Sequence, residues 1–330
     1  MAAAHQVSAV IFDLDGTILD TERATRDVLD EFLAAYGKVP DPEKEEKRLG
    51  QMYLESTSGI IRDYGLPLTV EEYSKAMHPL YLKRWQKAKP LPGVKRLVKH
   101  LYKNRVPLAI ASNSVRRNID HKVPKLEDNP INCAEVCWSQ GCQGFWAKAV
   151  AVPSLQSQRK HYNIADVILY SLLDFDPELW GLPPFEDRVQ GVLPIDPLIS
   201  TAQIGDRILN NLHRVVSDER TYNYIADQIS GIYLGWAKLK VHGFYKVVIG
   251  TGWDFSQQTV ERVMVVEFLD YTGKIETEPV KLLVIGYIRK LQITDDILQA
   301  LSVTDEDRSI ARDALDLQTF SEYAHDIHFS

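Results

Sequence analysis

The first part of the chain alternates apolar runs with polar and helical segments, a pattern typical of an α/β sheet. Residues 9–12 have the length and β-branched character of a buried strand, and the polar string Asp13-Leu-Asp-Gly-Thr17 follows at once. A second apolar run, at residues 106–111, ends in Ser112-Asn-Ser114. Because open α/β sheets bind ligands at the carboxyl ends of their strands, we expect both polar strings at a ligand-binding edge.

Helical periodicity fills the interval between these two apolar runs. Residues 23–37 predict an amphipathic helix that ends at Gly37, and residues 73–85 predict another helix. Pro90-Leu-Pro-Gly93 marks the return to the core, and residues 95–103 predict a helix with one apolar face. We therefore expect an α/β core with a small helical cap inserted after the first strand, at about residues 22–90.

The second half changes to β-rich runs separated by glycines at short intervals, which favours a compact antiparallel barrel. These runs are residues 230–237, 243–250, 259–268 and 280–288. Residues 192–197 have the composition of a linker, and residues 293–317 have helical periodicity. The predicted domains are residues 1–187 and residues 188–330.

Composition narrows the class of protein. The 330 residues carry a formal net charge of -7 without a block of Lys or Arg, which argues against a nucleic-acid partner. No apolar run reaches membrane-spanning length, and the N-terminal residues lack a signal-peptide pattern. The three cysteines, Cys133, Cys137 and Cys142, lack a fourth zinc ligand and indicate a reducing compartment. We expect a cytoplasmic protein, with a plastid location left open.

The strings after the two predicted strands carry carboxylates and hydroxyl groups. Asp13 and Asp15 are close enough to share a divalent cation, because two unpaired carboxylates repel each other. Gly16 permits a sharp turn after them. The Ser112 hydroxyl is suited to bind a phosphate oxygen, or to cap the next helix. These residue types predict phosphoryl chemistry, and the alternative is a strand followed by an ordinary polar turn.

Three strings and the helical cap resemble the haloacid dehalogenase-like phosphohydrolases; the strings are Asp13-Leu-Asp-Gly-Thr17, Leu91-Pro-Gly93 and Ala111-Ser-Asn113. Further strings extend the resemblance to both halves of the chain: Ser171-Leu-Leu-Asp174, Trp180-Gly-Leu-Pro-Pro-Phe185, Ser230-Gly-Ile-Tyr233, Gly252-Trp253 and Gly286-Tyr-Ile-Arg289. Together the halves resemble the plant bifunctional enzymes that join an FMN phosphatase to a riboflavin kinase. The resemblance implies a Rossmann-like core with a helical cap, followed by a mainly antiparallel β-barrel.

The resemblance also implies roles for residues of the first half. Asp13 matches the nucleophile that takes the phosphoryl group as an aspartyl-phosphate, and Asp15 matches the general acid/base. The Asp13 carboxylate and the Asp15 backbone carbonyl match ligands of Mg2+. Ser112, Asn113 and Thr17 match phosphate-binding positions. The implied substrate is FMN.

For the second half, the resemblance implies ATP-dependent phosphorylation of riboflavin with Mg2+ or Zn2+. Glu261 matches the acid that accepts the proton of the riboflavin hydroxyl. The family's Pro-Thr-Ala-Asn motif binds the metal and the nucleotide phosphates, and it aligns with residues 205–212. There Asn211 matches the Asn as a metal ligand, and Leu209 takes the place of the Thr. Asp254 stands where the family has Asn after Gly-Trp.

Two departures weaken the phosphatase motifs. The family places a lysine after the serine strand, to neutralise the nucleophile and the phosphoryl oxygens. The chain is shortened after Lys122, so Lys122 or Lys125 would have to substitute. The family's late acidic motif falls on Cys137 and Trp138, and Glu135 lies two residues earlier and deeper in the predicted strand.

Two hypotheses follow. In the first, the protein hydrolyses FMN and phosphorylates riboflavin, both with reduced activity because motif residues are missing. In the second, it is a catalytically inactive paralogue that binds a flavin or a protein. A protein partner would also cover apolar surface left by the shortened core. Three explanations stay open for the missing residues: divergence with loss of catalysis, alternative splicing, which block-like losses favour, and a new activity that uses Asp13 and Asp15.

Overall fold

The computed structural model describes residues 7–25, 27–48, 51, 53–114, 116–122, 135–137, 148–153, 159, 162–209, 211–216, 228–239, 243–256, 260–271, 275, 277–292, 294 and 296–325. The chain divides into two compact units. Unit 1 comprises Met1–Ser8, Pro92–Val106 and Gly144–Ser330, and unit 2 comprises Ala9–Leu91 and Pro107–Gln143. Residues 92–106 and 144–187 thus group with the second half of the chain, although they precede the predicted boundary. The boundary at residue 187 stays a prediction.

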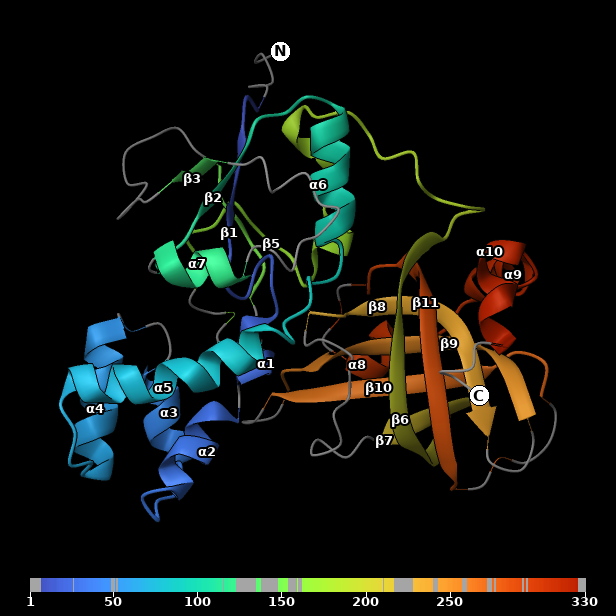
Figure 1. The fold of residues 1–330 in the computed structure, drawn as a ribbon. Helices are drawn as coiled ribbons and strands as arrows, with labels where there is room; N and C mark the ends of the chain where they lie inside the picture. Colours follow the sequence, from blue (N-terminus) through green and yellow to red (C-terminus); the bar gives the residue numbers. More distant parts are fainter. Residues whose placement is uncertain are drawn as a thin grey trace. The chain divides into compact units, whose positions relative to one another are not determined.

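Unit 2 is built on a small parallel sheet (Figure 1). β1 (Val10–Asp13), β2 (Leu108–Ala111) and β3 (Glu135–Cys137) pair in the order β1-β2-β3. The register aligns Asp13 with Ala111, and Ala111 with Cys137, so the three strands end at one level. This confirms the predicted α/β core and places the polar strings after β1 and β2 at one edge of the sheet.

Helices make up most of the remaining described part of unit 2. They are α1 (Thr21–Thr25), α2 (Val28–Ala34), α3 (Pro42–Arg48), α4 (Tyr53–Tyr64), α5 (Val70–Trp85) and α7 (Arg116–Lys122). Thr69 and Glu72 form a capping box at the start of α5. The Glu72 N–H donates to the Thr69 hydroxyl at 3.2 Å, and the Thr69 N–H donates to the Glu72 carboxylate at 2.9 Å. Phe32 and Met77 belong to one buried apolar cluster of α2, α4 and α5. The structure thus contains the helical cap predicted for about residues 22–90.

The single helix predicted over residues 23–37 is two helices. α1 ends at Thr25 and α2 begins at Val28. At the end of α1 the Thr25 hydroxyl donates to the Thr21 carbonyl at 2.8 Å, a side-chain bond that competes with the helical backbone pattern. The Arg84 guanidinium of α5 donates to the two carboxylate oxygens of Asp27 at 2.9 and 2.6 Å, which fixes the start of α2.

In unit 1, α6 (Val94–Lys103) packs against a segment from the middle of the chain. Gly93 has a φ of +84°, and a Cβ there would lie 2.5 Å from the backbone of Leu172, so only glycine fits. The Arg96 guanidinium binds both carboxylate oxygens of Asp187 at 2.7 and 2.8 Å. The short elements of this segment are β4 (Val150–Ala151) and β5 (Val167–Ile168), which pair in parallel, and the 3-10 turns η4 (Leu172–Asp174) and η5 (Pro177–Trp180).

Six antiparallel strands of unit 1 close into a barrel in the order β10-β7-β6-β11-β8-β9 (Figure 1). They are β6 (Leu193–Leu209), β7 (Leu212–Val216), β8 (Gly231–Leu239), β9 (Gly243–Asp254), β10 (Glu261–Phe268) and β11 (Pro279–Arg289). The barrel confirms the fold predicted for the second half. Its strands β8 to β11 correspond to the four β-rich runs of the sequence.

β6 corrects the prediction that residues 192–197 form a linker. This segment begins a strand of 17 residues. The first part of β6 pairs with β11, where Pro194 lies opposite Gly286, and the pairing with β7 starts at Gln203. Proline has no N–H to donate, and a strand edge without a second neighbour tolerates it. The prolines give the segment the composition of a linker although it is a strand.

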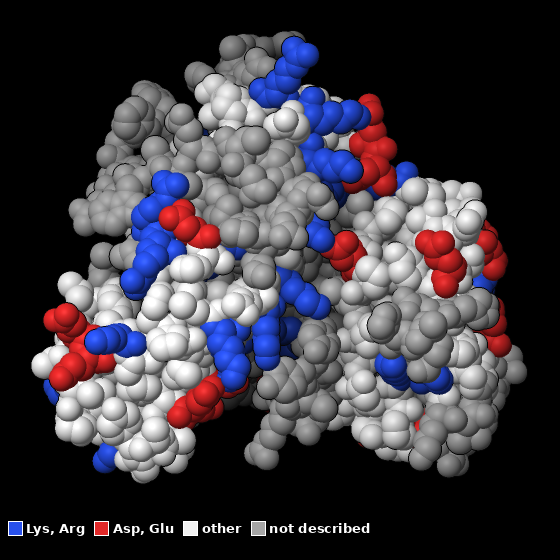
Figure 2. All heavy atoms as spheres, viewed as in Figure 1, with Lys and Arg blue, Asp and Glu red and all other residues white. Residues whose placement is uncertain are grey.

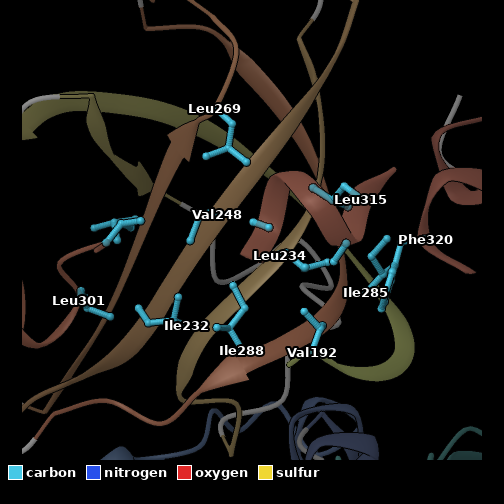
Figure 3. Close-up of a cluster of buried hydrophobic side chains, with 14 of the residues drawn as sticks. Val192, Ile232, Leu234, Val248, Leu269, Ile285, Ile288, Leu301, Leu315 and Phe320 are labelled. Atoms are coloured by element: carbon cyan, nitrogen blue, oxygen red, sulfur yellow. The ribbon is translucent and has the colours of Figure 1, made fainter. Parts of the chain in front are cut away.

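A buried apolar cluster joins the barrel strands to the C-terminal helices (Figure 3). Val248 and Ile285 from strands pack with Leu301, Leu315 and Phe320. The helices are α8 (Ile297–Ala300), α9 (Asp305–Leu315) and α10 (Gln318–Ser321), followed by the turn η6 (Glu322–His325). They correspond to the helical periodicity expected over residues 293–317. Within the described ranges, no helix has the length and apolar character needed to cross a membrane.

Candidate active site

The turn after β1 carries the two predicted catalytic aspartates. Asp13 ends the strand, and the N–H of Ile18 then donates to the Leu14 carbonyl at 3.1 Å. Gly16 has a φ of 73°, a conformation that a side chain would strain. The side chains of Leu14 and Ile18 are fully buried and anchor the turn. The turn therefore holds Asp15 at the carboxyl edge of the sheet.

Asp15 is bound by a lysine from α7. Lys122 Nζ donates to Asp15 Oδ1 at 2.7 Å and to Oδ2 at 3.0 Å. The Ser114 hydroxyl, which follows β2, donates to Asp15 Oδ2 at 2.8 Å and lies 3.0 Å from Lys122 Nζ. Lys122 is 3% exposed, so its ammonium is desolvated and depends on these partners. The structure thus gives Lys122 a place in the site, while Lys125 lies outside the described residues.

An aromatic side chain of α5 covers Lys122. Lys122 Nζ lies over the Trp85 ring, 4.4 Å from its centroid. Trp85 stacks on Tyr81, with ring centroids 5.6 Å apart and ring planes 13° apart. Trp85 is the last residue of α5 and is buried. The site therefore draws its residues from the β1 turn, from the loop and helix after β2, and from the cap.

Asp13 lies in a different electrostatic setting from Asp15. Desolvation by the surrounding protein raises the pKa of its carboxyl to about 6. A hydrogen bond from the Leu14 backbone opposes this rise, the negative charge of Asp15 adds to it, and the positive charge of Lys122 again opposes it. As a whole residue Asp13 is exposed. Its carboxylate therefore carries a charge that is only partly compensated, which suits a cation or an electrophile.

The three predicted phosphate-binding residues lie in the two turns after the strands. Ser112 directly follows β2 and is 8% exposed; its Oγ accepts a bond from the Ser114 N–H at 3.1 Å. Asn113 is exposed in the same bend, and Thr17 is half-buried in the turn after Gly16. Ser114 belongs to the polar string that the sequence singled out, but its contact with Asp15 depends on the path of the chain after β2.

The oxygen groups at this edge fit a magnesium ion. Mg2+ prefers oxygen ligands and retains several waters, so one carboxylate and one carbonyl are a sufficient protein contribution. Asp13 would supply the carboxylate and Asp15 the backbone carbonyl. Over the described part of the chain, no group of three or more His, Cys, Asp or Glu side chains gathers to hold a metal. In the strand register Cys137 is level with Asp13 and Glu135 is two residues deeper, as the sequence predicts; Trp138 lies outside the described residues.

In the barrel, Glu261 and Asp254 lie opposite each other on β10 and β9. Such cross-strand partners have Cβ atoms about 5 Å apart, so the two carboxyl groups share one face. Asp254 accepts a bond from the Ser256 N–H at 2.8 Å, and hydrogen bonds with Ser256 lower the pKa of Asp254. The position that is Asn in the family therefore adds a negative charge beside Glu261.

Asn211 lies at the other end of β10 from Glu261. Its neighbour Leu212 pairs with Glu267, six residues beyond Glu261. At about 3.3 Å per residue, this separation is about 20 Å along the strand. Asn211 Oδ1 accepts a bond from Arg207 at 3.2 Å. The structure does not bring Asn211 and Glu261 together, so the alignment that made them parts of one kinase site needs correction.

A further string with the residues Thr-Ala lies within β6. Ser200-Thr-Ala-Gln203 shares its central Thr-Ala with the kinase family's motif. Thr201 precedes Gln203, where the described pairing of β6 with β7 begins, and Glu261 precedes Val265, where the described pairing of β10 with β7 begins.

Comparison with known proteins supports the two-part organisation. Residues 10–131 match the model of the haloacid dehalogenase-like hydrolase family, and residues 210–315 match that of the riboflavin kinase family. The bifunctional riboflavin kinase/FMN phosphatase of Arabidopsis thaliana is 31% identical over 365 aligned positions, which cover 97% of this chain and 96% of that protein. The chain belongs to the bifunctional riboflavin kinase/FMN phosphatase family.

Other relatives of this family member match about half of the chain. The (DL)-glycerol-3-phosphatase 2 of Arabidopsis thaliana is 26% identical over 230 residues, covering 56% of this chain and 96% of that protein. The crystal structure of CbbY from Rhodobacter sphaeroides with phosphate has 16% identity and a TM-score of 0.43, covering 51% of this chain and 96% of that chain. The alignment with the bifunctional relative has 365 positions for a chain of 330 residues, so it includes gaps in this chain, in agreement with shortened segments.

Proposed function

We propose that unit 2 hydrolyses the phosphomonoester FMN in the presence of Mg2+. The observation that carries this proposal is the contact of Lys122 with Asp15, two residues from Asp13. The shortened segment after β2 removes the position where the family places its lysine, and phosphoryl transfer needs that positive charge. In this proposal Lys122 supplies the charge. FMN is proposed as the substrate because the Arabidopsis thaliana relative is named for FMN phosphatase activity.

Asp13 is the nucleophile of the proposed reaction. One of its carboxylate oxygens attacks phosphorus, the bond from phosphorus to the alkoxide oxygen of FMN breaks, and an aspartyl-phosphate forms. Asp15 gives a proton to the departing alkoxide and then takes a proton from the water that hydrolyses the aspartyl-phosphate. The products are riboflavin and inorganic phosphate. Mg2+ held by Asp13 and the Asp15 carbonyl would supply charge neutralisation at the phosphoryl oxygens.

In the proposed reaction the Lys122 ammonium binds two acceptors one after the other, first Asp15 and then the phosphate of the substrate. In the free site, Lys122 and the Ser114 hydroxyl bind the carboxylate of Asp15. A bound phosphate dianion offers the ammonium a second acceptor, which weakens its hold on Asp15. Asp15 can then carry the proton that it delivers to the leaving alkoxide. Ser112, at the end of β2, offers a hydroxyl to the phosphate at the same edge.

The helix that carries Lys122 is basic on its exposed side. Arg116 and Arg117 are exposed on α7, and Figure 2 shows basic side chains over this helix. Arg116 pairs with Asp120 of the same helix at 2.8 Å. A local excess of positive charge attracts an anionic phosphate ester although the chain as a whole is acidic.

Phosphate release from FMN by the full chain tests the proposal. The wild-type protein is expected to release riboflavin and phosphate with Mg2+, and Asp13→Asn is expected to stop the reaction. Asp120→Asn, which also neutralises one carboxylate near the site but lies exposed on α7, serves as the matched control and should retain activity. If the wild-type protein releases no phosphate above the Asp13→Asn background, the proposed hydrolysis is wrong.

The barrel supports a second candidate function, transfer of the ATP γ-phosphate to riboflavin. The observation in its favour is the position of Glu261 at the start of β10 in a closed six-stranded barrel, because Glu261 would accept the proton of the riboflavin hydroxyl. Riboflavin incubated with Mg2+ and ATP should yield FMN. Glu261→Gln should abolish the product, and Asn211→Ala should not. Flavin binding without turnover in both assays would instead support an inactive, flavin-binding paralogue.

A further inference from the structure

Trp85 contacts the lysine that the proposed hydrolysis uses. The Lys122 ammonium has three N–H donors. Its polar neighbours are the two carboxylate oxygens of Asp15, at 2.7 and 3.0 Å, and the Ser114 hydroxyl, at 3.0 Å. The Trp85 ring lies 4.4 Å from the same Nζ. A cation over an indole face is attracted by the ring quadrupole, and more strongly where water is excluded.

This contact joins the cap to the core within unit 2. Trp85 ends α5 of the cap, and Lys122 ends α7, which follows β2 of the sheet. Tyr81, one turn earlier on α5, stacks on the indole and restricts its rotation. The cap thus fixes the orientation of the ring, while the core fixes the position of the ammonium.

The surroundings of Trp85 on the α7 side are cationic. His78 lies edge-on to Trp85, with ring centroids 6.3 Å apart. Burial, together with the positive charge of Arg117 on α7, lowers the pKa of His78. The groups in direct contact with the Lys122 ammonium, among those the structure describes, are Asp15, Ser114 and the indole. Without the ring, one side of the ammonium would be open to water.

We propose that Trp85 is a positioning residue for phosphate-ester hydrolysis at Asp13: its indole holds the Lys122 ammonium on Asp15 and excludes water from that ion pair. This inference rests on the proposed function of unit 2. Trp85 acts through Lys122 and not on the reacting atoms. Because the ring belongs to the cap, this support of the ammonium requires contact between α5 and α7.

Chemical modification of Lys122 gives a readout that needs no turnover. The full chain is treated with acetic anhydride, and acetylation of Lys122 is followed by peptide mass spectrometry in the wild type, Trp85→Leu and Trp85→Phe. Loss of the ring in Trp85→Leu should raise the acetylation rate roughly ten-fold, and Trp85→Phe should stay within about three-fold of the wild type because it keeps an aromatic face. The exposed Lys103 provides an internal reference in each sample.

Phe32→Leu is the matched control for general loosening of the cap. Phe32 is another buried aromatic residue of the cap, and its ring lies edge-on to Tyr73 with centroids 5.1 Å apart. Its removal should lower the melting temperature but leave acetylation of Lys122 at the wild-type rate. The proposal is overturned if Phe32→Leu raises that rate as much as Trp85→Leu does, or if Trp85→Leu leaves it unchanged.

A double-mutant cycle shows whether Trp85 acts through Lys122. Trp85→Leu should lower kcat/KM for FMN roughly ten-fold in the wild-type background and have no further effect in the Lys122→Met background. Equal losses in both backgrounds would assign Trp85 a purely structural role and overturn the inference. If the wild-type protein does not hydrolyse FMN, the proposed function fails, and the acetylation experiment still decides whether Trp85 holds Lys122.

Discussion

Lys122 donates to both carboxylate oxygens of Asp15, at 2.7 and 3.0 Å, from the last position of α7. The two residues are 107 positions apart in the chain. A lysine that is buried to this degree would be costly to the fold without its carboxylate partner. The pair therefore links the stability of unit 2 to the charge balance of its candidate active site.

Lys122→Met is expected to lower kcat/KM for FMN by roughly 10²–10³-fold, because the phosphoryl oxygens lose a preorganised positive charge. Lys122→Arg should recover only part of this loss, since a planar guanidinium cannot replace a compact ammonium between Asp15 and Trp85. Steady-state phosphate release measures the effect. Lys83→Met, which removes the same charge from an exposed position of α5, is the control, and equal rates for the two methionine variants would contradict the assignment.

Asp254→Asn is expected to strengthen ATP binding by the barrel. The substitution restores the family's residue and removes a negative charge opposite Glu261. One unit of charge at about 4 Å with the full screening of water is worth about 1 kcal/mol, or roughly a five-fold lower KM for ATP. Riboflavin phosphorylation at varied ATP concentration checks this. Asp270→Asn, at an exposed position, makes the same change in net charge and should leave the KM unaltered.

Gly93→Ala is expected to lower the free energy of unfolding of unit 1 by more than the strain of a positive φ accounts for. A methyl group at Gly93 would lie 2.5 Å from the backbone of Leu172, whereas Gly37, with a φ of +66°, has open space around a Cβ. Gly37→Ala should therefore cost only the left-handed conformation, about 1–2 kcal/mol in the free energy of unfolding. Gly93→Ala should exceed it by more than about 1 kcal/mol in urea denaturation. Equal costs would mean that the segment at Leu172 moves freely.

Tyr287→Phe is expected to make unit 1 more sensitive to rising pH. Desolvation raises the pKa of Asp174, and a hydrogen bond from the Tyr287 hydroxyl opposes that rise. A carboxyl whose pKa is higher in the folded than in the unfolded protein favours folding at low pH. That contribution is complete below the unfolded value of about 3.9 and is lost as the pH rises through the folded pKa.

Loss of the Tyr287 hydroxyl leaves the ionised Asp174 with a weaker set of partners. The free energy of unfolding of Tyr287→Phe should fall by about 1–3 kcal/mol at pH 7 and by less at pH 4. Urea denaturation at both pH values measures the difference. Tyr102→Phe, at an exposed tyrosine of the same unit, should show no pH-dependent change. A deficit in Tyr287→Phe of the same size at both pH values would contradict this account.

The aspartates of the candidate site follow from local sequence because Asp13 and Asp15 directly succeed an apolar run, and the end of a strand determines where they lie. The contact of Asp15 with Lys122 does not follow in this way. It depends on where α7 starts after Ser114 and how far it extends, and neither is encoded in the residues around Asp15. A family motif pointed to a lysine, but the shortened segment removed the spacing that would have identified it.

The barrel strands β8 to β11 were predictable because β-branched residues alternate with turn glycines. β6 was not predictable, because Pro194 and Pro197 are typical of a linker. Only the pairing of this segment with β11 shows that it is a strand, whose other edge tolerates proline.

The pairing of β11 with both β6 and β8 has a consequence for how the chain folds. Leu193 lies opposite Tyr287, so closing the barrel brings together segments almost a hundred residues apart. Such non-local pairing must overcome the entropy of a long loop before its contacts form, and it is slow. During synthesis, β6 and β8 therefore cannot complete their strand pairing until β11 has been made. A nascent chain or a fragment that ends before residue 279 leaves one edge of β6 and one edge of β8 unpaired, and unpaired edges favour aggregation.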